Sequence, residues 1–327
     1  DNNKAEFIDV PFVIDVFDII WTNCILPFML YLKKIEVYHG MKWPGPMFNP
    51  ALPVFTVHSI MTDYKGSFPV SFKTRMFIKC FLMPQLKHMK RLIAVSEFVK
   101  EYLINKVSLN TNKIDTVYNS CSNDFRLLDS DTVTAVKQKY GIPEKYILQV
   151  GNINPVKNQK TTLKAFAKIV KKFDYSLIMV GKMGNQYYEG VKELMSKLNL
   201  QDDIIFTGFI SQDDLASLMN GARGLVIPSL TEGCPVTMIE AFRCGLPIIC
   251  SRRGGLSELG KNASLFIDDP FNENHLAKNI ELLIEDNTTY ESLRNTCIQK
   301  GKRFSWELSA QQHLAIYEKE RKNADSQ

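Results

Sequence analysis

Several features that mark specialised classes of protein are missing from this sequence. Its seven cysteines show no paired spacing and no CxxC (positions 24, 80, 121, 234, 244, 250 and 297). That pattern argues for reduced thiols and against both a disulfide framework and a structural zinc site. No Asp-x-Asp stands in a metal-like context, since Asp213–Asp214 begins a predicted helix and Asp202–Asp203 precedes a strand. We therefore expect no bound metal and no cofactor.

No long apolar run is free of charge, and no signal peptide opens the chain. The most apolar stretch, residues 12–32, contains Asp15, Asp18 and Pro27 and divides into a strand-like piece and a helix-like piece. Membrane spans rarely carry two carboxylates, so a buried core segment is favoured over a span. The expected location is the cytoplasm.

Composition is that of an ordinary globular protein. The 327 residues predict two domains, and 45% apolar and 23% charged residues are usual values. A net charge of +5 favours anionic ligands or surfaces. It does not require nucleic acid, and we expect no nucleic-acid partner.

From Tyr146 onward, apolar strands alternate with amphipathic helices. Strands are predicted at 146–151, 175–181, 203–208, 224–229 and 247–251, and helices at 159–172, 187–198, 212–221, 235–244, 273–286 and 288–303. Continuously apolar strands between helices predict a parallel sheet covered on both faces. Ligands of such doubly wound domains bind beyond the carboxyl ends of the strands.

The first half is also α/β but less regular. We predict a helix at 19–34, strands at 35–40, 53–59 and 114–120, and a strand running into a helix at 91–99, with Ser96 as the helix N-cap. These are too few strands for a full nucleotide-binding half. The domain boundary is expected near 121–143.

The segment LTEGCPVTMIEAFRCGLPII (230–249) carries the strongest functional signal. Glu232 follows an apolar strand. Glu240 lies inside the next helix, with seven residues between the two. Pro235 suits the first helical position. A helix start such as 235–237 offers free N–H donors and a positive dipole end to a phosphate. The two carboxylates can reach groups on the order of 10 Å apart, about the span from hexose to ribose in a nucleotide-sugar.

This arrangement resembles the retaining glycosyltransferases of family 4, which have the GT-B fold. Their signature of Glu-x7-Glu, Ala and Cys-Gly-x-Pro stands here as Glu232, Glu240, Ala241 and Cys244-Gly245-x-Pro247. The stretches GNINPVKNQKTTLKAF, TGFISQDDLASLM, SRRGGLSEL and FSWELSAQQHLAIYEK also follow in the family's order. A bare pair of Glu would be weak evidence, but this context is specific.

The resemblance implies two Rossmann-like domains with parallel sheets facing across a cleft. The first would comprise residues 1–121 with the C-terminal helix 305–327, and the second residues 122–304. In the second, Glu240 would bind the ribose hydroxyls, Glu232 the sugar, and the helix start with Gly233, Cys234, Val236 and Thr237 the diphosphate. Members carry further residues before the equivalent of Ile19, so the first domain is expected to be incomplete.

Lys157 lies in GNINPVKN, between a strand end and a helix start, where its charge could neutralise a leaving diphosphate. Asn154 and Pro155 would build the turn that aims it. The family has an arginine directly after Gly151 or just before the lysine, and this chain has Asn152 and Val156 there. One cation would therefore hold the diphosphate. The alternative is a solvated lysine at a helix start.

Other positions are less specific. His58 ends an apolar strand, where a core role and a family-implied contact to the donor sugar or its phosphate stay open. Gly208 and Phe209, with Thr207, resemble the edge that binds the base. Gly254, Gly255 and Glu258 line the cleft or form a plain strand–helix turn. The basic, apolar-interleaved segment 72–91 either lies on an anionic membrane or packs as an ordinary helix.

The implied activity is retaining, metal-independent transfer of a hexose from a nucleotide-diphosphate sugar to a glycan or lipid-linked acceptor, in bacterial surface polysaccharide synthesis. Two other functions stay open. One is a non-catalytic protein that binds a nucleotide-sugar or acts as a scaffold, and the other is a sugar-nucleotide epimerase of the same fold.

Overall fold

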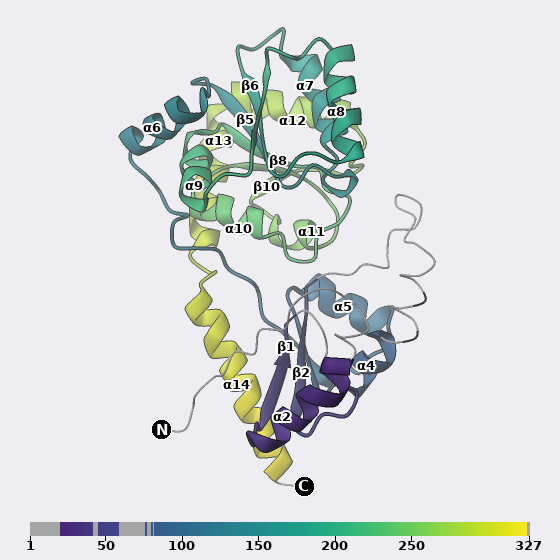
Figure 1. Ribbon diagram of the computed structural model, residues 1–327. Helices are drawn as coiled ribbons and strands as arrows, with labels where there is room; N and C mark the ends of the chain where they lie inside the picture. Colours follow the sequence, from purple (N-terminus) through teal and green to yellow (C-terminus); the bar gives the residue numbers. More distant parts are fainter. Residues whose placement is uncertain (1–19, 42–44, 59–75, 77–79, 81, 326–327) are drawn as a thin grey trace. The chain divides into compact units, whose positions relative to one another are not determined.

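A computed structural model describes residues 20–41, 45–58, 76, 80 and 82–325 of the chain (Figure 1). These residues form two compact units. Unit 1 contains the described residues up to Ala94, Tyr102–Thr116 and the chain from His313 onward, and unit 2 contains Val95–Glu101 and Val117–Gln312. The helices α5 (Glu97–Asn105) and α14 (Trp306–Asp325) each begin in unit 2 and end in unit 1.

Unit 2 is built on a six-stranded parallel sheet in the order β10-β9-β8-β5-β6-β7. Its strands are β5 (Tyr146–Val150), β6 (Ser176–Val180), β7 (Ile204–Gly208), β8 (Gly224–Ile227), β9 (Ile248–Ser251) and β10 (Ser264–Ile267). The first five confirm the sequence prediction, and β10 was missed. Strand order reverses between β5 and β8, as expected of a doubly wound sheet.

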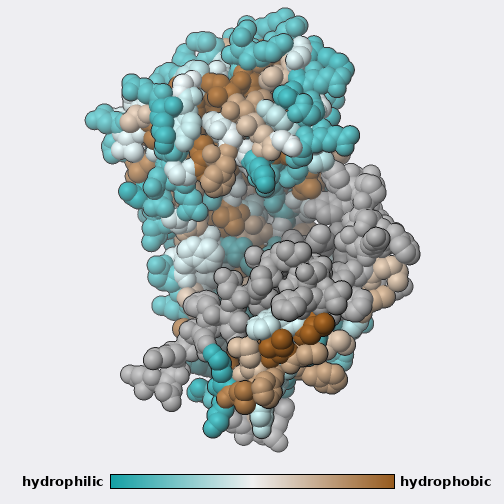
Figure 2. Space-filling view, in the orientation of Figure 1, coloured by the Kyte–Doolittle hydropathy of each residue, from teal (hydrophilic) through white to brown (hydrophobic). Residues whose placement is uncertain are grey.

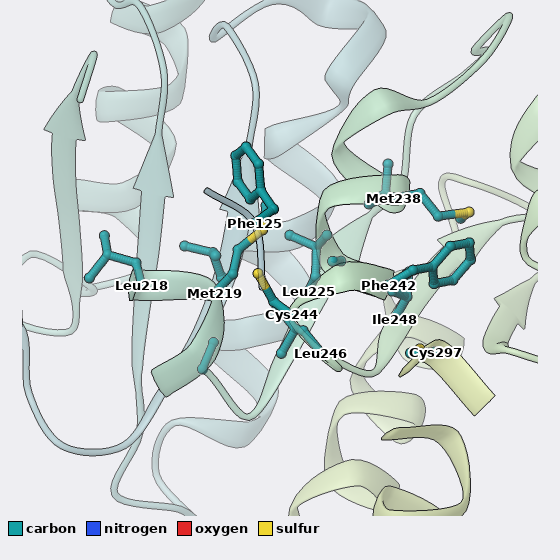
Figure 3. Close-up of a cluster of buried hydrophobic side chains, with 14 of the residues drawn as sticks. Phe125, Leu218, Met219, Leu225, Met238, Phe242, Cys244, Leu246, Ile248 and Cys297 are labelled. Carbon is teal, nitrogen blue, oxygen red and sulfur yellow. The ribbon is translucent and has the colours of Figure 1, made fainter. Parts of the chain in front are cut away.

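Alternating strand residues divide the core of unit 2 into two layers. Ile147 packs with α7 (Gln159–Ile169), α8 (Gln186–Lys197) and α12 (Glu273–Glu285), whereas Leu148 packs with the layer that includes α9 (Gln212–Gly221) and α10 (Val236–Arg243). Figure 3 shows side chains of this second layer, among them Phe125, Phe242 and Cys297. Because both faces of β5, β6, β8 and β9 are largely buried, these strands are mostly apolar.

The remaining helices of unit 2 close these layers. They are α6 (Ser130–Tyr140), α11 (Gly255–Leu259) and α13 (Asn287–Gly301). The helix α6 was not predicted, although Asp129 caps its start and Gly141 ends it in a left-handed conformation. Pro235, expected at the first helical position of α10, instead forms the N-cap residue with extended backbone, and Val236 begins the helix.

Unit 1 contains a four-stranded parallel sheet in the order β1-β2-β3-β4. Its strands are β1 (Val37–Gly40), β2 (Leu52–Val57), β3 (Arg91–Ala94) and β4 (Ile114–Thr116), and its helical segments include η1 (Trp21–Ile25), α2 (Leu26–Leu32), α4 (Met83–His88) and η3 (Thr111–Lys113). Ser96 Oγ accepts the Val99 N–H at 3.2 Å, which confirms it as the cap of α5.

The prediction of a buried core segment at 12–32 is only half right. Leu26 and Leu30 of α2 are buried, but Phe28, Tyr31 and Leu32 are each more than 60% exposed. Brown, apolar atoms accordingly appear on the surface of unit 1 in Figure 2. Residues 12–19 lie outside the described part. Within that part, none of the helices combines the length and apolar character needed to cross a bilayer.

The end of α14 packs into unit 1 through polar contacts. Tyr317 hydrogen-bonds His39 of β1, whose other ring nitrogen lies 2.7 Å from Thr56 Oγ1. Burial lowers the pKa of His39 to about 3, and the neighbouring His313 adds to this effect. Glu320 forms a buried ion pair with Arg91. His39 is thus part of the packing of α14.

The basic segment 72–91 was expected either to face a membrane or to pack as a helix. Phe72, Lys73, Arg75, Phe77, Lys79 and Phe81 lie outside the described residues. Arg91 is only 6% exposed, so its charge faces Glu320 and not a surface. Pro84 lies in the first turn of α4, where its missing N–H costs no hydrogen bond.

Candidate donor-binding site

The candidate residues of unit 2 gather where its strand order reverses. The chain leaves β5 through Gly151–Asn158 and leaves β8 through Pro228–Pro235, and these two strands are neighbours in the sheet. Crossover connections diverge at such a point and leave a crevice beyond the strand ends. The Leu230 N–H donates to Val156 O at 2.8 Å, which joins the two loops directly.

Lys157 ends a short 3₁₀ turn, η4 (Pro155–Lys157), for which Asn154 is the N-cap residue. Asn154 Oδ1 accepts the Lys157 N–H at 3.1 Å, as the sequence predicted for this turn. The Lys157 side chain runs along Gly151, where a Cβ atom would lie 3.1 Å from its Cε. Gly151 also has φ of +137°, a backbone conformation that favours glycine.

Lys157 Nζ donates to Glu232 Oε1 at 2.6 Å. Both side chains are partly buried, with 24% and 16% of their surface exposed. The sequence alternative of a solvated lysine is therefore wrong. Instead, the ammonium and the carboxylate face each other across the two loops that follow β5 and β8.

Two glycines hold the backbone around Glu232. The Gly255 N–H donates to Glu232 O at 2.8 Å. A Cβ at Gly254 would meet Glu232 O at 2.4 Å, and one at Gly255 would meet Gly233 O at 2.2 Å. Only residues without a side chain permit this approach, so the Gly254–Gly255 turn supports the Glu232 loop.

The helix α10 begins beside this loop and has no side-chain cap at Pro235. Cys234, Val236 and Thr237 are partly buried around its start. Burial raises the pKa of the Cys234 thiol to about 12, so it stays protonated and is not a nucleophile. The start of α10 keeps unsatisfied backbone donors, as helix starts without a cap do.

Glu240 lies more than a turn into α10, and its carboxyl group is largely withdrawn from water. Burial raises the pKa of Glu240 from its ordinary 4.5 to about 7, and the positive charge of Lys157 opposes that shift. Lys157 therefore acts electrostatically on Glu240 while it is paired with Glu232. The three groups form one charged cluster, the Lys157–Glu232–Glu240 cluster.

The ends of β5, β6 and β7 form a glycine row next to this cluster. The Gly181 N–H donates to Gly208 O at 2.9 Å, and a Cβ on Gly181 would meet Gly151 O at 2.2 Å. Phe209 follows Gly208 and is 87% exposed. Asn152 Oδ1 accepts the Lys182 N–H, so Asn152 ties β5 to β6.

His58 is not part of this group of residues in unit 2. It follows β2 in unit 1, where its ring is exposed and lies near His39 and His313. Glu258, for which two roles were open, accepts the N–H groups of Glu97 and Phe98 at 3.1 and 2.8 Å and the Tyr118 hydroxyl. It therefore caps the start of α5 in unit 2.

Sequence reasoning missed the buried amides behind the Lys157 loop. Gln149 Nε2 donates to Lys157 O at 2.9 Å, Gln159 Nε2 donates to Asn152 O at 3.1 Å, and Asn158 contacts two strand ends. An amide inside an otherwise apolar strand, such as Gln149, is the available signal. No group of three His, Cys, Asp or Glu side chains that could hold a metal is found among the residues the structure describes.

The fold is that of the GT-B glycosyltransferases, with two parallel α/β sheets. The sequence pattern of the family described as "Glycosyl transferases group 1" matches residues 133–304, more than half of the chain. The chain belongs to this family, as its motifs predicted. The predicted α/β GT-B fold class is confirmed as well.

Two relatives and one solved structure illustrate the similarity. The chain is 26% identical to the serotype-specific mannosyltransferase WbdA of Escherichia coli over 245 residues, which are 72% of this chain but only 30% of WbdA. It is 27% identical over 287 residues to O-antigen chain mannosyltransferase B of Escherichia coli, covering 87% of this chain and 74% of that protein. A glycosyltransferase from Rickettsia africae shares the fold with a TM-score of 0.76 at 18% identity, over 96% of this chain and 84% of that one.

Proposed function

We propose that this protein transfers a hexose from a nucleotide-diphosphate sugar to a glycan or lipid-linked acceptor with retention of anomeric configuration. The observation that carries the proposal is the Lys157–Glu232–Glu240 cluster at the strand-order reversal. It combines one cation, two carboxylates and an uncapped helix start. A nucleotide-sugar offers the matching groups in sequence: sugar hydroxyls, diphosphate and ribose hydroxyls.

In this proposal each group contacts one part of the donor. Glu232 accepts hydrogen bonds from the sugar, and Glu240 accepts them from the ribose. Lys157 and the N–H groups of Val236 and Thr237 bind the diphosphate. Gly208 and Phe209 face the base, and Gly151 lets the donor approach the backbone. His58 contributes a contact to the sugar or phosphate from unit 1. Residues 122–304 make up the donor domain.

The reaction we propose breaks the bond between sugar C1 and the phosphate oxygen and forms a bond from C1 to the acceptor oxygen on the same face. The acceptor proton moves to an oxygen of the departing phosphate, so no protein nucleophile is needed. Lys157 stabilises the charge that develops on that phosphate. This charge stabilisation is the main electrostatic requirement of the step.

The relatives motivate a finer assignment. Both are named as mannosyltransferases, one of them for the O-antigen chain. We propose mannose as the sugar and a growing surface polysaccharide as the acceptor. The chain spans 30% of WbdA, so this assignment concerns the matched portion of that relative. A cytoplasmic site, peripheral at an anionic membrane through segment 72–91, fits a lipid-linked acceptor.

A transfer assay with UDP-, GDP- and ADP-sugars, mannose donors included, tests the proposal. Radiolabelled sugar should move to a lipid-linked oligosaccharide acceptor for one of the donors. Binding of a donor without turnover would favour the non-catalytic alternative. Conversion of the donor sugar without acceptor would favour an epimerase. Failure of every donor to bind would contradict the proposed site itself.

A further inference from the structure

Asn158, directly after Lys157, has a buried side chain in an unusual backbone conformation. Its φ and ψ are 55° and 42°, the left-handed region that non-glycine residues seldom occupy. The residue is 4% exposed. It ends the η4 turn and forms the N-cap position of α7, so it joins the Lys157 loop to the helix behind it.

The side chain of Asn158 makes three hydrogen bonds. Nδ2 donates to Pro228 O at 3.2 Å and to Pro270 O at 2.7 Å, just beyond the ends of β8 and β10. Oδ1 accepts the Thr161 hydroxyl at 2.8 Å. Rotating the amide would set Oδ1 against two carbonyl oxygens, so only one orientation satisfies all partners.

These bonds fix the backbone from which Lys157 projects. Gln149 Nε2 holds Lys157 O on one side, and Leu230 holds Val156 O on the other. Asn158 also contacts the loop that carries Glu232. Its side chain donates to Pro228 O, and Pro228 lies four residues before Glu232. Asn158 therefore links the backbone that carries Lys157 to the loop that carries Glu232.

We propose that Asn158 is a positioning residue for Lys157, setting where the cation meets the diphosphate of the donor. The inference rests on the proposed function, because it takes Lys157 as the diphosphate ligand. Asn158 touches neither donor nor acceptor in this account. Its effect should appear on ligands that carry the second phosphate and not on those that lack it.

The experiment compares nucleoside mono- and diphosphate affinity in Asn158→Gly and the wild type, by calorimetry on the full chain. Glycine keeps the left-handed backbone and removes only the side-chain bonds. Asn199→Gly is the matched control, because Asn199 has φ of 54° but is exposed. Both nucleotides carry the same base, which is chosen as the one whose nucleoside diphosphate the wild type binds.

We expect Asn158→Gly to lower the diphosphate affinity about tenfold, or about 1.4 kcal/mol. The monophosphate affinity and the Asn199→Gly control should stay unchanged, because only the second phosphate contacts the cation that Asn158 positions. In a Lys157→Met background the same change should have no further effect on the ratio. An unchanged ratio in Asn158→Gly, or an equal loss for both ligands, would overturn the inference and leave the proposed function standing.

A milder variant covers the case in which Asn158→Gly does not fold. Thr161→Val removes the hydroxyl that orients the Asn158 amide and should shift the same ratio in the same direction by a smaller factor. An unchanged ratio in Thr161→Val would then overturn the inference. If the wild type binds neither nucleotide, the proposed function fails and this inference fails with it.

Discussion

Lys157 Nζ and Glu232 Oε1 lie 2.6 Å apart across two loops that leave neighbouring strands of a parallel sheet. The proposed ligands of the diphosphate and of the sugar thus satisfy each other when no donor is bound. Donor binding has to exchange this ion pair for contacts to the ligand. Because the ammonium and the carboxylate are 24% and 16% exposed, water still reaches both groups when no donor is bound.

The raised pKa of Glu240 predicts a pH-dependent stability that Glu240→Gln removes. The folded pKa of about 7 lies above the ordinary 4.5, so the folded state holds its proton more tightly. The stabilisation is complete below pH 4.5 and is lost as the pH rises through 7. At pH 8 the Gln variant should be more stable by about 3 kcal/mol, and at pH 4 equal to wild type. Chemical unfolding followed from pH 4 to 8 measures this, and a constant difference would contradict it.

Removal of the Lys157 charge should raise the pKa of Glu240 further. The ammonium lowers that pKa, and Lys157→Met takes the effect away. Carbon-13 NMR titration of labelled glutamate side chains would show the Glu240 midpoint moving above 7. Lys182→Met is the control, because Lys182 is exposed and does not act on Glu240. Equal midpoints in both variants would refute the coupling within the Lys157–Glu232–Glu240 cluster.

Loss of the buried partner of Arg91 should destabilise unit 1. Glu320→Ala leaves a guanidinium that is 7% exposed, with Asp115 at 3.3 Å as the remaining carboxylate. Breaking a buried pair costs about 3–5 kcal/mol, and Asp115 should keep the loss near 3. Glu36→Ala removes the exposed pair with Arg321 and should cost under about 0.5 kcal/mol. Hydrogen exchange of β3 amides reports both values, and equal exchange rates would show that α14 does not support the sheet.

We expect activity to survive EDTA. In the proposed site, Lys157 and a helix start bind the diphosphate, whereas metal-dependent transferases use a divalent metal ion for this. The assay is sugar transfer before and after chelation and dialysis. Activity lost on chelation and restored by Mn²⁺ or Mg²⁺ would contradict this account of the diphosphate site.

Sequence periodicity predicted most of unit 2 because its strands are buried on both faces. Five strands and the helices between them follow from apolar runs separated by glycine turns. The strand β10, a four-residue strand at the edge of the sheet, was missed, although its burial is similar to that of β7, which was predicted. The helix α6 was missed because most of its residues are polar and only Val133 and Lys137 are buried. An apolar pattern reveals buried faces, and α6 has little buried surface.

The candidate site was predictable where chemistry sits in a short segment. Lys157, Glu232 and Glu240 were found because they lie in two short sequence motifs, GNINPVKN and the Glu-x7-Glu segment. Asn158 and Glu258 were harder, since their partners lie 70 or more residues away in the chain. Hydrogen bonds between residues far apart in the chain produce no periodic pattern in the sequence. Positions such as Asn158, where a left-handed residue precedes a helix, are visible only in the backbone.

Calorimetry of donor binding to Glu240→Ala and Glu232→Ala tests the division of the site most directly. Hydrogen bonds to charged groups contribute about 1.5–3 kcal/mol each, so either loss is measurable. Glu240→Ala should weaken the free nucleoside diphosphate and the intact nucleotide-sugar alike, through the ribose. Glu232→Ala should spare the nucleoside diphosphate and weaken only the nucleotide-sugar. Unchanged diphosphate affinity in Glu240→Ala, or equal losses for both ligands in Glu232→Ala, would contradict the account.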